Sequence, residues 1–284
     1  MTLDTYYMET FFTFLAKRVD DCSSLLCVGL DPSPSDLPAP TAAAAREFCL
    51  RIVHQTAPYA AAFKPNAAFF EQYGPDGWAA LREVIATVQD ESDRLGSLIP
   101  VILDAKRGDI ASTAEAYARS AFGNLGAHAI TLNPYPGRDS LDPFLAYKEK
   151  GVFLLCKTSN PGAADLQDLP VAIDGQPPVP LHVHIARLAQ AWNTGNNLGV
   201  VVGATQPEAL ARVRAAAPDL WFLVPGVGAQ GGDLETALRH GLRADGKGVL
   251  INISRGIARA ADPRAEAVRL RDEMINIRYG MQHD

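Results

Sequence analysis

Eight short apolar runs alternate with longer segments of helical pattern along most of this chain, and this alternation is what most constrains its fold. The apolar runs span residues 25–30, 60–63, 99–103, 129–132, 152–155, 198–202, 221–224 and 249–253. Alanine-rich or amphipathic segments of helical length lie between them, at 42–56, 78–95, 113–123, 181–192, 207–217 and 233–240. Buried strands that alternate with helices indicate the α/β class, with a mainly parallel sheet covered by helices.

The spacing of the runs favours a closed barrel. Between residues 25 and 255 the eight units average about 29 residues each, which suits a (β/α)8 barrel, the TIM-barrel fold. A doubly wound open sheet is the main alternative. The barrel is preferred because polar residues end several runs, and a barrel gathers the C-terminal ends of its strands at one active-site mouth. We therefore expect a single domain over 1–284, with an N-terminal helix in 1–24, the barrel core in 25–256, and a C-terminal helix and tail in 257–284.

The third apolar run ends in alternating charges, an unusual ending for a strand built only for packing. Side chains two apart on a strand point to the same face, so Asp104 and Lys106 are expected to project together. Asp109 follows in the turn toward the next helix. A structural role is the alternative, because Asp109 could cap that helix and Ser112 with Glu115 has the pattern of a capping box.

Glycine-rich and basic residues follow the last two apolar runs. Gly228 and Gly231 lie after the seventh run, and Arg255 with Gly256 lies after the eighth. In (β/α)8 enzymes the loops after strands seven and eight often bind phosphate through backbone N–H groups and a helix N-terminus. The planar guanidinium of Arg255 suits two phosphate oxygens. An ordinary surface turn is the alternative interpretation of the glycines alone.

Composition excludes several classes of protein. A net charge of −6 argues against a general nucleic-acid binder but allows a local positive pocket. No apolar stretch reaches the roughly 20 residues that span a bilayer, so no membrane partner is expected. The four cysteines show no C-x-x-C spacing, and reduced thiols in the cytoplasm are the simplest interpretation. His182 and His184 have no acidic or cysteine partner at a suitable spacing, so we expect surface positions rather than metal ligands.

Four sequence motifs resemble those of the orotidine 5'-monophosphate decarboxylase family, over roughly residues 25–255. They are Phe63-Lys64, Leu103-Asp104-Ala105-Lys106-Arg107-Gly108-Asp109-Ile110, Thr158-Ser159-Asn160-Pro161-Gly162 and Pro225-Gly226-Val227-Gly228-Ala229-Gln230-Gly231-Gly232. The resemblance implies a (β/α)8 barrel that converts orotidine 5'-monophosphate to uridine 5'-monophosphate and CO2 without a cofactor or metal. The form Asn160-Pro161-Gly162 and the long segment 163–180 look like the longer bacterial branch.

The resemblance also implies roles for individual residues. The catalytic array would consist of four alternating charges, Lys64, Asp104, Lys106 and Asp109. The substrate contacts would be Asp31 and Lys64 to the ribose hydroxyls, Ser159 to the pyrimidine, and Gln230 with Arg255 to the phosphate. The chain would form a homodimer, in which three residues enter the partner's site: Asp109, Ile110 and Thr113.

The chemistry of this reaction agrees with those residues. Loss of CO2 from the orotate ring leaves a carbanion at C6 with no adjacent carbonyl to take up the charge. The site must therefore stabilise that carbon electrostatically and then protonate it. Lys106 lies between two carboxylates in the sequence, which favour its ammonium form, and an ammonium group can do both.

Other functions use the same barrel and must be weighed. A Schiff-base aldolase would need a neutral Lys106 or Lys64, which neighbouring carboxylates oppose. A metal-dependent sugar-acid phosphate decarboxylase shares the Asp-x-Lys-x-x-Asp pattern, but relatives of that kind carry an acid where this chain has Lys64, and a lysine repels Mg²⁺. A non-enzymatic phosphate-binding module would need the glycines and Arg255 but not four alternating charges.

Overall fold

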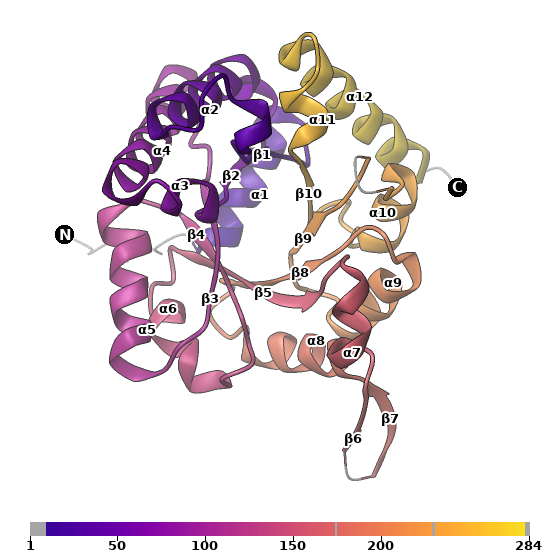
Figure 1. The fold of residues 1–284 in the computed structure, drawn as a ribbon. Coiled ribbons are helices and arrows are strands. Elements are labelled where there is room, and N and C mark those ends of the chain that lie inside the picture. The colour runs from indigo at the N-terminus through magenta and orange to yellow at the C-terminus, as the bar shows by residue number, and fades with distance from the viewer. Residues whose placement is uncertain (1–9, 174, 229–230, 282–284) are drawn as a thin grey trace, which may run out of the picture.

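The computed structural model describes residues 10–173, 175–228 and 231–281, and its main sheet is a closed parallel barrel (Figure 1). The strands are β1 (Leu26–Leu30), β2 (Ala62–Pro65), β3 (Ile102–Arg107), β4 (Ala129–Leu132), β5 (Gly151–Lys157), β8 (Leu198–Val202), β9 (Phe222–Pro225) and β10 (Val249–Ile253). Their order is β2-β1-β10-β9-β8-β5-β4-β3. Isolated parallel bridges from Phe63 to Val101 and from Asn66 to Asp104 join the two outer strands. The expected α/β class and (β/α)8 barrel are confirmed.

Helices cover the outside of the barrel (Figure 1). The longer ones are α2 (Ala42–Thr56), α4 (Gly74–Leu95), α5 (Ala111–Ala118), α8 (Leu181–Trp192), α9 (Pro207–Ala216), α10 (Leu234–Gly241) and α12 (Pro263–Met281). Four-residue helices are α3 (Ala68–Glu71), α6 (Asp142–Leu145), α7 (Ala164–Gln167) and α11 (Arg255–Ala258). Each of the six expected helical segments overlaps one of these helices, because its apolar side chains recur at helical spacing. No helix in the described part of the chain is long and apolar enough to cross a membrane.

Helix α1 (Phe11–Cys22) closes the N-terminal end of the barrel and lies behind it in Figure 1. Phe12 stacks on Trp221, with ring centroids 5.9 Å apart, and meets Phe153 edge-on at 5.6 Å. A Cβ at Gly151 would lie 2.4 Å from the Phe11 ring, so only glycine leaves room for that ring. The N-terminal helix expected within 1–24 therefore begins, in the described residues, at Phe11.

Two strands lie further along the chain than the sequence predicted. The second strand spans Ala62–Pro65 rather than 60–63, and the third spans Ile102–Arg107 rather than 99–103. Residues Ile99 and Val101 are buried, but they precede the regular pairing of β3 with β4. An apolar run marks burial, whereas strand bounds depend on backbone pairing with a neighbour that is distant in sequence.

The segment 163–180 contains a small hairpin in addition to α7. Strands β6 (Pro170–Ile173) and β7 (Gln176–Pro180) pair antiparallel and project from the barrel (Figure 1). Gly175 has a φ of 75°, a conformation that glycine adopts readily in a tight turn.

Candidate active site at the barrel mouth

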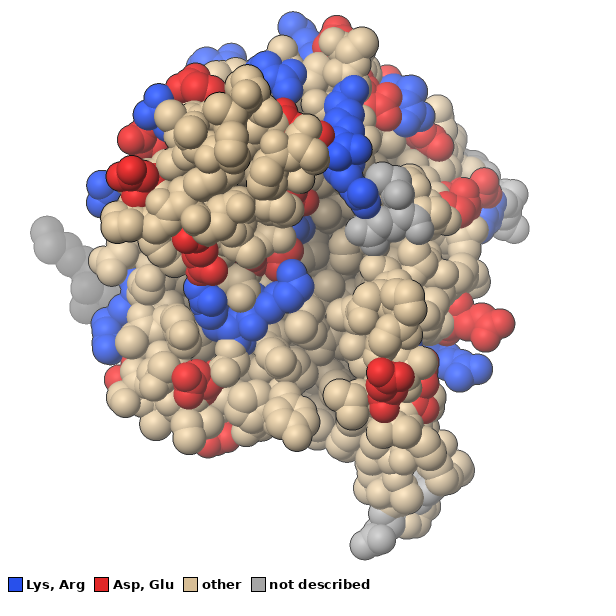
Figure 2. Space-filling view, in the orientation of Figure 1, with Lys and Arg blue, Asp and Glu red and all other residues tan. Residues whose placement is uncertain are grey.

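A chain of opposite charges crosses two neighbouring strands at the barrel mouth. Lys64 ends its strand beside Asp104, with Nζ 2.8 Å from Oδ2. The other carboxylate oxygen of Asp104 accepts from Lys106 Nζ at 2.5 Å. Figure 2 shows this end of the barrel hollowed at its centre, with Lys and Arg side chains on the rim. The structure thus brings together three of the four charges that the sequence predicted as a catalytic array.

Thr131 on β4 completes this cluster, and sequence reasoning missed it. Its hydroxyl donates to Asp104 Oδ1 at 3.0 Å and accepts from the backbone N–H groups of Ala105 and Lys106 at 3.1 and 3.0 Å. The residue is only 1 % exposed. A hydroxyl inside the apolar run 129–132 was the available signal, because a buried hydroxyl needs partners.

The backbone at Lys106 departs from a regular strand. The pairing of β3 with β4 shifts register between Leu103 and Arg107, and Lys106 has a φ of 47°. Strand alternation alone therefore does not explain why Asp104 and Lys106 meet, although their contact was expected. A non-glycine residue in the left-handed region costs about 1–3 kcal/mol and persists only where its surroundings hold it, as the two hydrogen bonds to Thr131 do here.

Burial and charge act in opposite directions on Lys64 and Asp104. Burial alone lowers the pKa of Lys64, which is 4 % exposed, but the carboxylates of Asp104 and Asp31 reverse this and hold its pKa above the ordinary value. Burial alone raises the pKa of Asp104, but the ammonium groups of Lys64 and Lys106 hold it well below the usual range. Both residues are therefore charged at neutral pH.

Two buried oxygens near the ends of adjacent strands have no hydrogen-bond partner among the described residues. They are Asp31 Oδ1, directly after β1, and Asn252 Oδ1 on β10. Strands β1 and β10 pair in parallel. Because an unpaired buried acceptor is costly, these atoms are suited to ligand groups that donate hydrogen bonds. Asp31 was a sequence candidate, whereas Asn252, at the polar end of the run 249–253, was given no role from the sequence.

The candidate phosphate residues lie after β9 and β10. Gly226, Gly228 and Gly231 have φ values of 98°, 72° and 88°, so this loop uses conformations that favour glycine. Arg255 and Gly256 begin α11 and are exposed. Gln230, which the sequence also assigned to phosphate, lies outside the described residues.

The segment after β3 presents its candidate residues outward. Ile110 is 55 % exposed, and Thr113 on the first turn of α5 is also exposed. Asp109 accepts from the backbone N–H of Ile110 at 2.8 Å and makes no ion pair within the described chain. Helix α5 begins after Ile110 with no side-chain cap, so the alternative in which Asp109 or Ser112 caps it is wrong.

Ser159 lies in the loop after β5 and is half-buried. A Cβ at Gly203 would lie 3.2 Å from Ser159 Cβ, so the chain after β8 packs closely behind this serine.

For metals, the described ranges contain no group of three or more His, Cys, Asp or Glu side chains that could hold an ion.

A closed parallel barrel with coupled charges at the C-terminal ends of its strands defines a (β/α)8 protein with the site geometry of barrel enzymes. Residues 24–270 match the model of the "Orotidine 5'-phosphate decarboxylase / HUMPS family", and the chain belongs to that family.

Several similar proteins are named as decarboxylases of orotidine 5'-phosphate. Orotidine 5'-phosphate decarboxylase of Roseiflexus sp. (strain RS-1) is 50 % identical over 260 residues, which cover 88 % of this chain and 91 % of the relative. That of Haloarcula marismortui is 50 % identical, covering 90 % and 89 %. The solved structure of Leishmania donovani OMP decarboxylase is 56 % identical, with a TM-score of 0.84 and coverage of 95 % and 99 %. The assignment to a longer bacterial branch stays a prediction.

Proposed function

We propose that this chain decarboxylates orotidine 5'-monophosphate to uridine 5'-monophosphate, a step of pyrimidine biosynthesis. The observation that carries the proposal is the Lys64–Asp104–Lys106 chain of charges at the mouth of a barrel of this family. A phosphate-binding module would have no use for a buried carboxylate held between two ammonium groups, because such a pair is costly to desolvate.

The reaction needs a fixed positive charge beside the reacting carbon. The bond between C6 and the carboxylate breaks, CO2 leaves, and the electron pair stays on C6. The Lys106 ammonium stabilises that pair and then transfers one proton from Nζ to C6, which gives the uridine product. Asp104 holds Nζ through the 2.5 Å contact, and Thr131 holds Asp104. This charge acts where negative charge develops, so it lowers the barrier.

Contacts away from C6 would orient the substrate. Asp31 and Lys64 are assigned to the ribose hydroxyls, in keeping with the unpaired buried oxygen of Asp31. Ser159 is assigned to the pyrimidine, and Arg255 with Gln230 and the glycines Gly228, Gly231 and Gly256 to the phosphate. Binding energy from the phosphate can then offset the cost of ordering and desolvating the ring.

We further propose a cytoplasmic homodimer in which Asp109, Ile110 and Thr113 enter the partner's site. The exposed apolar side chain of Ile110 and the absence of an ion pair to Asp109 within the described chain support this. Four free buried cysteines suit a reducing compartment.

Mixing two inactive variants tests the shared site. In a hybrid of Lys106→Ala and Asp109→Ala, one site has both intact residues. Equimolar mixing with subunit exchange should restore about one quarter of wild-type activity, since about half of the dimers are hybrids with one good site each. No recovery in a mixture shown to contain hybrids would contradict the shared site.

The reaction itself is tested by the loss of ultraviolet absorbance of orotidine 5'-monophosphate in the presence of EDTA. We expect turnover by the purified chain at a rate unchanged by added Mg²⁺. Failure of the folded protein to consume the substrate would reject the function. Turnover of sugar-acid phosphates only with Mg²⁺ would favour the metal-dependent alternative, which the position of Lys64 at the end of β2 opposes.

A further inference from the structure

The loop that carries Ser159 is held from the side by Gln167 of α7. Gln167 Oε1 accepts from the backbone N–H of Thr158 at 2.9 Å, and Gln167 Nε2 donates to Thr158 Oγ1 at 2.8 Å. Thr158 Oγ1 then donates to Asn160 Oδ1 at 2.7 Å. Because the backbone N–H can only donate, the amide orientation is determined and the direction of each following hydrogen bond is set. The residues on both sides of Ser159 are thus restrained by one side chain.

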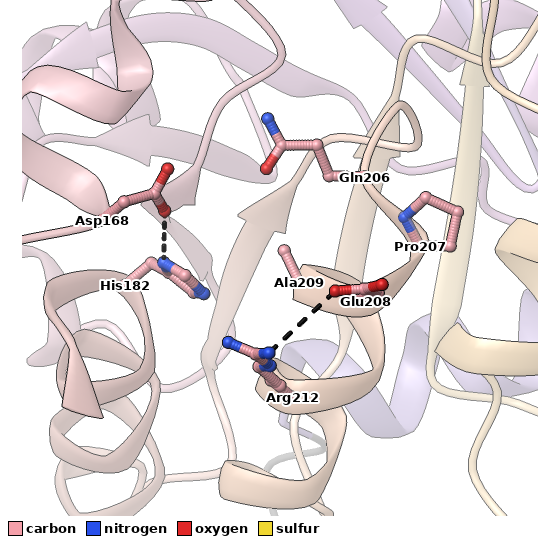
Figure 3. Close-up of a pocket in the computed structure, with 7 residues that line it drawn as sticks. All are labelled: Asp168, His182, Gln206, Pro207, Glu208, Ala209 and Arg212. Carbon is pink, nitrogen blue, oxygen red and sulfur yellow. Dashed lines mark ion pairs between the residues drawn. The ribbon is translucent and has the colours of Figure 1, made fainter. Parts of the chain in front are cut away.

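An ion pair holds the base of the same loop. Lys157 ends β5, is 1 % exposed, and contacts Asp168 Oδ1 through Nζ at 2.7 Å. The same oxygen lies 3.2 Å from His182 Nδ1, as Figure 3 shows. That nitrogen is also 2.9 Å from the carbonyl oxygen of Gln167. Since a carbonyl only accepts, Nδ1 carries the proton, and His182 connects α8 to the end of α7.

His182 therefore differs from its expected surface position, because it is only 3 % exposed. Its sequence-distant partner Asp168 comes from the segment before β6, a contact that spacing along the chain did not indicate. Asp168 and His182 also line one wall of a cavity of about 410 Å³, opposite Arg212 and Glu208 of α9 (Figure 3). The Asp168 carboxylate thus faces solvent, whereas Lys157 is buried.

The segment around Gln167 contributes little to the barrel core. Leu166 and Leu169, on either side of Gln167 and Asp168 in the sequence, are 59 % and 49 % exposed. Behind Ser159, by contrast, the backbone N–H of Gly203 donates to the carbonyl of Lys157 at 2.8 Å. Ser159 is therefore enclosed by a rigid strand end on one side and by the polar contacts of Gln167 on the other. Those contacts restrain an exposed loop more than they stabilise the fold.

We infer that Gln167 is a positioning residue that presents Ser159 to the pyrimidine ring, with the Lys157–Asp168–His182 linkage fixing the segment from which it acts. This rests on the proposed function, which assigns Ser159 to the pyrimidine. Its effect is limited to ligands that contain the ring, because the ribose and phosphate residues come from other strands.

The test compares Gln167→Ala with wild type for two ligands, uridine 5'-monophosphate and ribose 5-phosphate, by calorimetry. The variant should bind the nucleotide about tenfold more weakly, because two neutral hydrogen bonds are lost and water replaces them only in part. Binding of ribose 5-phosphate, which lacks the ring, should stay within about twofold. Gln167→Glu keeps an acceptor for the Thr158 N–H and should recover most of the nucleotide affinity.

Gln190, near the C-terminal end of α8, supplies a matched control. It makes the same kind of paired contact, accepting from the Asp219 backbone N–H at 3.2 Å and donating to the Asp219 carboxylate at 3.0 Å. Gln190→Ala should leave both affinities unchanged, and its melting temperature shows what loss of such a pair does to stability alone.

The possible results separate the inference from the proposed function. Equal weakening of both ligands by Gln167→Ala, or no weakening, overturns the inference. If wild type binds the nucleotide without consuming orotidine 5'-monophosphate, the reaction is rejected while the ligand comparison still decides the role of Gln167. If wild type does not bind the nucleotide, both are rejected.

Discussion

At the N-terminal end of the barrel a buried arginine is paired and apolar rings are packed, whereas at the mouth two buried oxygens are left for a ligand. Arg18 of α1 is buried at the closed end, where it donates to the carbonyl oxygens of Ala57 and Ala60 at 2.8–3.1 Å. At the mouth, Asp31 and Asn252 keep buried oxygens without a partner in the described chain. The two ends share the same strands but differ in what their side chains contact.

This difference separates stability from chemistry along the barrel axis. The packed rings at the closed end stabilise the fold and are separate from the charges at the mouth. The charges at the mouth are costly to bury and are held by a few specific contacts. The backbone of Lys106 there adopts the left-handed conformation, which is itself costly. Substitutions at the closed end should therefore change stability alone, whereas substitutions at the mouth should change activity.

Lys106→Ala should have the largest effect on turnover. It removes both the positive charge and the proton donor, so kcat should fall at least about 10⁴-fold. The free energy of unfolding should change by about 1 kcal/mol or less, because this side chain is 47 % exposed and Asp104 keeps Lys64 as a partner. Steady-state assays with denaturant unfolding measure both quantities. Residual activity within a hundredfold of wild type would contradict the proposed role.

Asp104→Asn should lower both activity and stability. Lys64 would stay buried beside a neutral amide, at a cost of about 3–5 kcal/mol at neutral pH. The pKa of Asp104 in the folded chain lies below its usual 3.8, so its charge stabilises the fold above that pH and this contribution is lost as pH falls through the folded value. The stability gap between wild type and variant should therefore narrow from about pH 4 downward in chemical unfolding. A gap that is constant with pH would contradict this electrostatic account.

Phe12→Ala tests the closed end. Loss of a buried ring that contacts Trp221 and Phe153 should cost about 3–5 kcal/mol of unfolding free energy. Values of kcat and KM measured below the melting range should stay within about twofold of wild type. Phe12→Leu fills part of the space and should cost less. A selective fall in kcat would show that the two ends are coupled.

Of the three substitutions at the mouth, Thr131→Val should have the smallest effect on activity. Valine keeps the shape but leaves Asp104 and two backbone N–H groups without their hydroxyl partner, so kcat should fall about tenfold. Thr131→Ser retains the hydroxyl and should remain near wild type. Equal activity of the two variants would show that the hydroxyl does not hold Asp104.

Much of the molecule could be predicted from local pattern. The alternation of apolar runs and helical segments identified all eight barrel strands in order, with the bounds of β2 and β3 displaced by two to four residues. Polar residues at strand ends indicated Lys64, Asp104 and Lys106 because the barrel brings parallel strand ends to one mouth. The catalytic and binding roles of all the candidate site residues, including Asp109 and Gln230, stay predictions.

The residues that sequence reasoning missed share a physical cause. The hydrogen bonds of Thr131 and Gln167 and the unpaired oxygen of Asn252 depend on how segments that are not adjacent in the chain pack together. Side-chain periodicity is local, since it follows from backbone geometry over a few residues, and it determined the order and type of the barrel elements. The contacts of Asp104 were decided only when β3 closed against β2 and β4, because hydrogen bonds act over about 3 Å and its partners Lys64 and Thr131 lie 40 and 27 positions away along the chain.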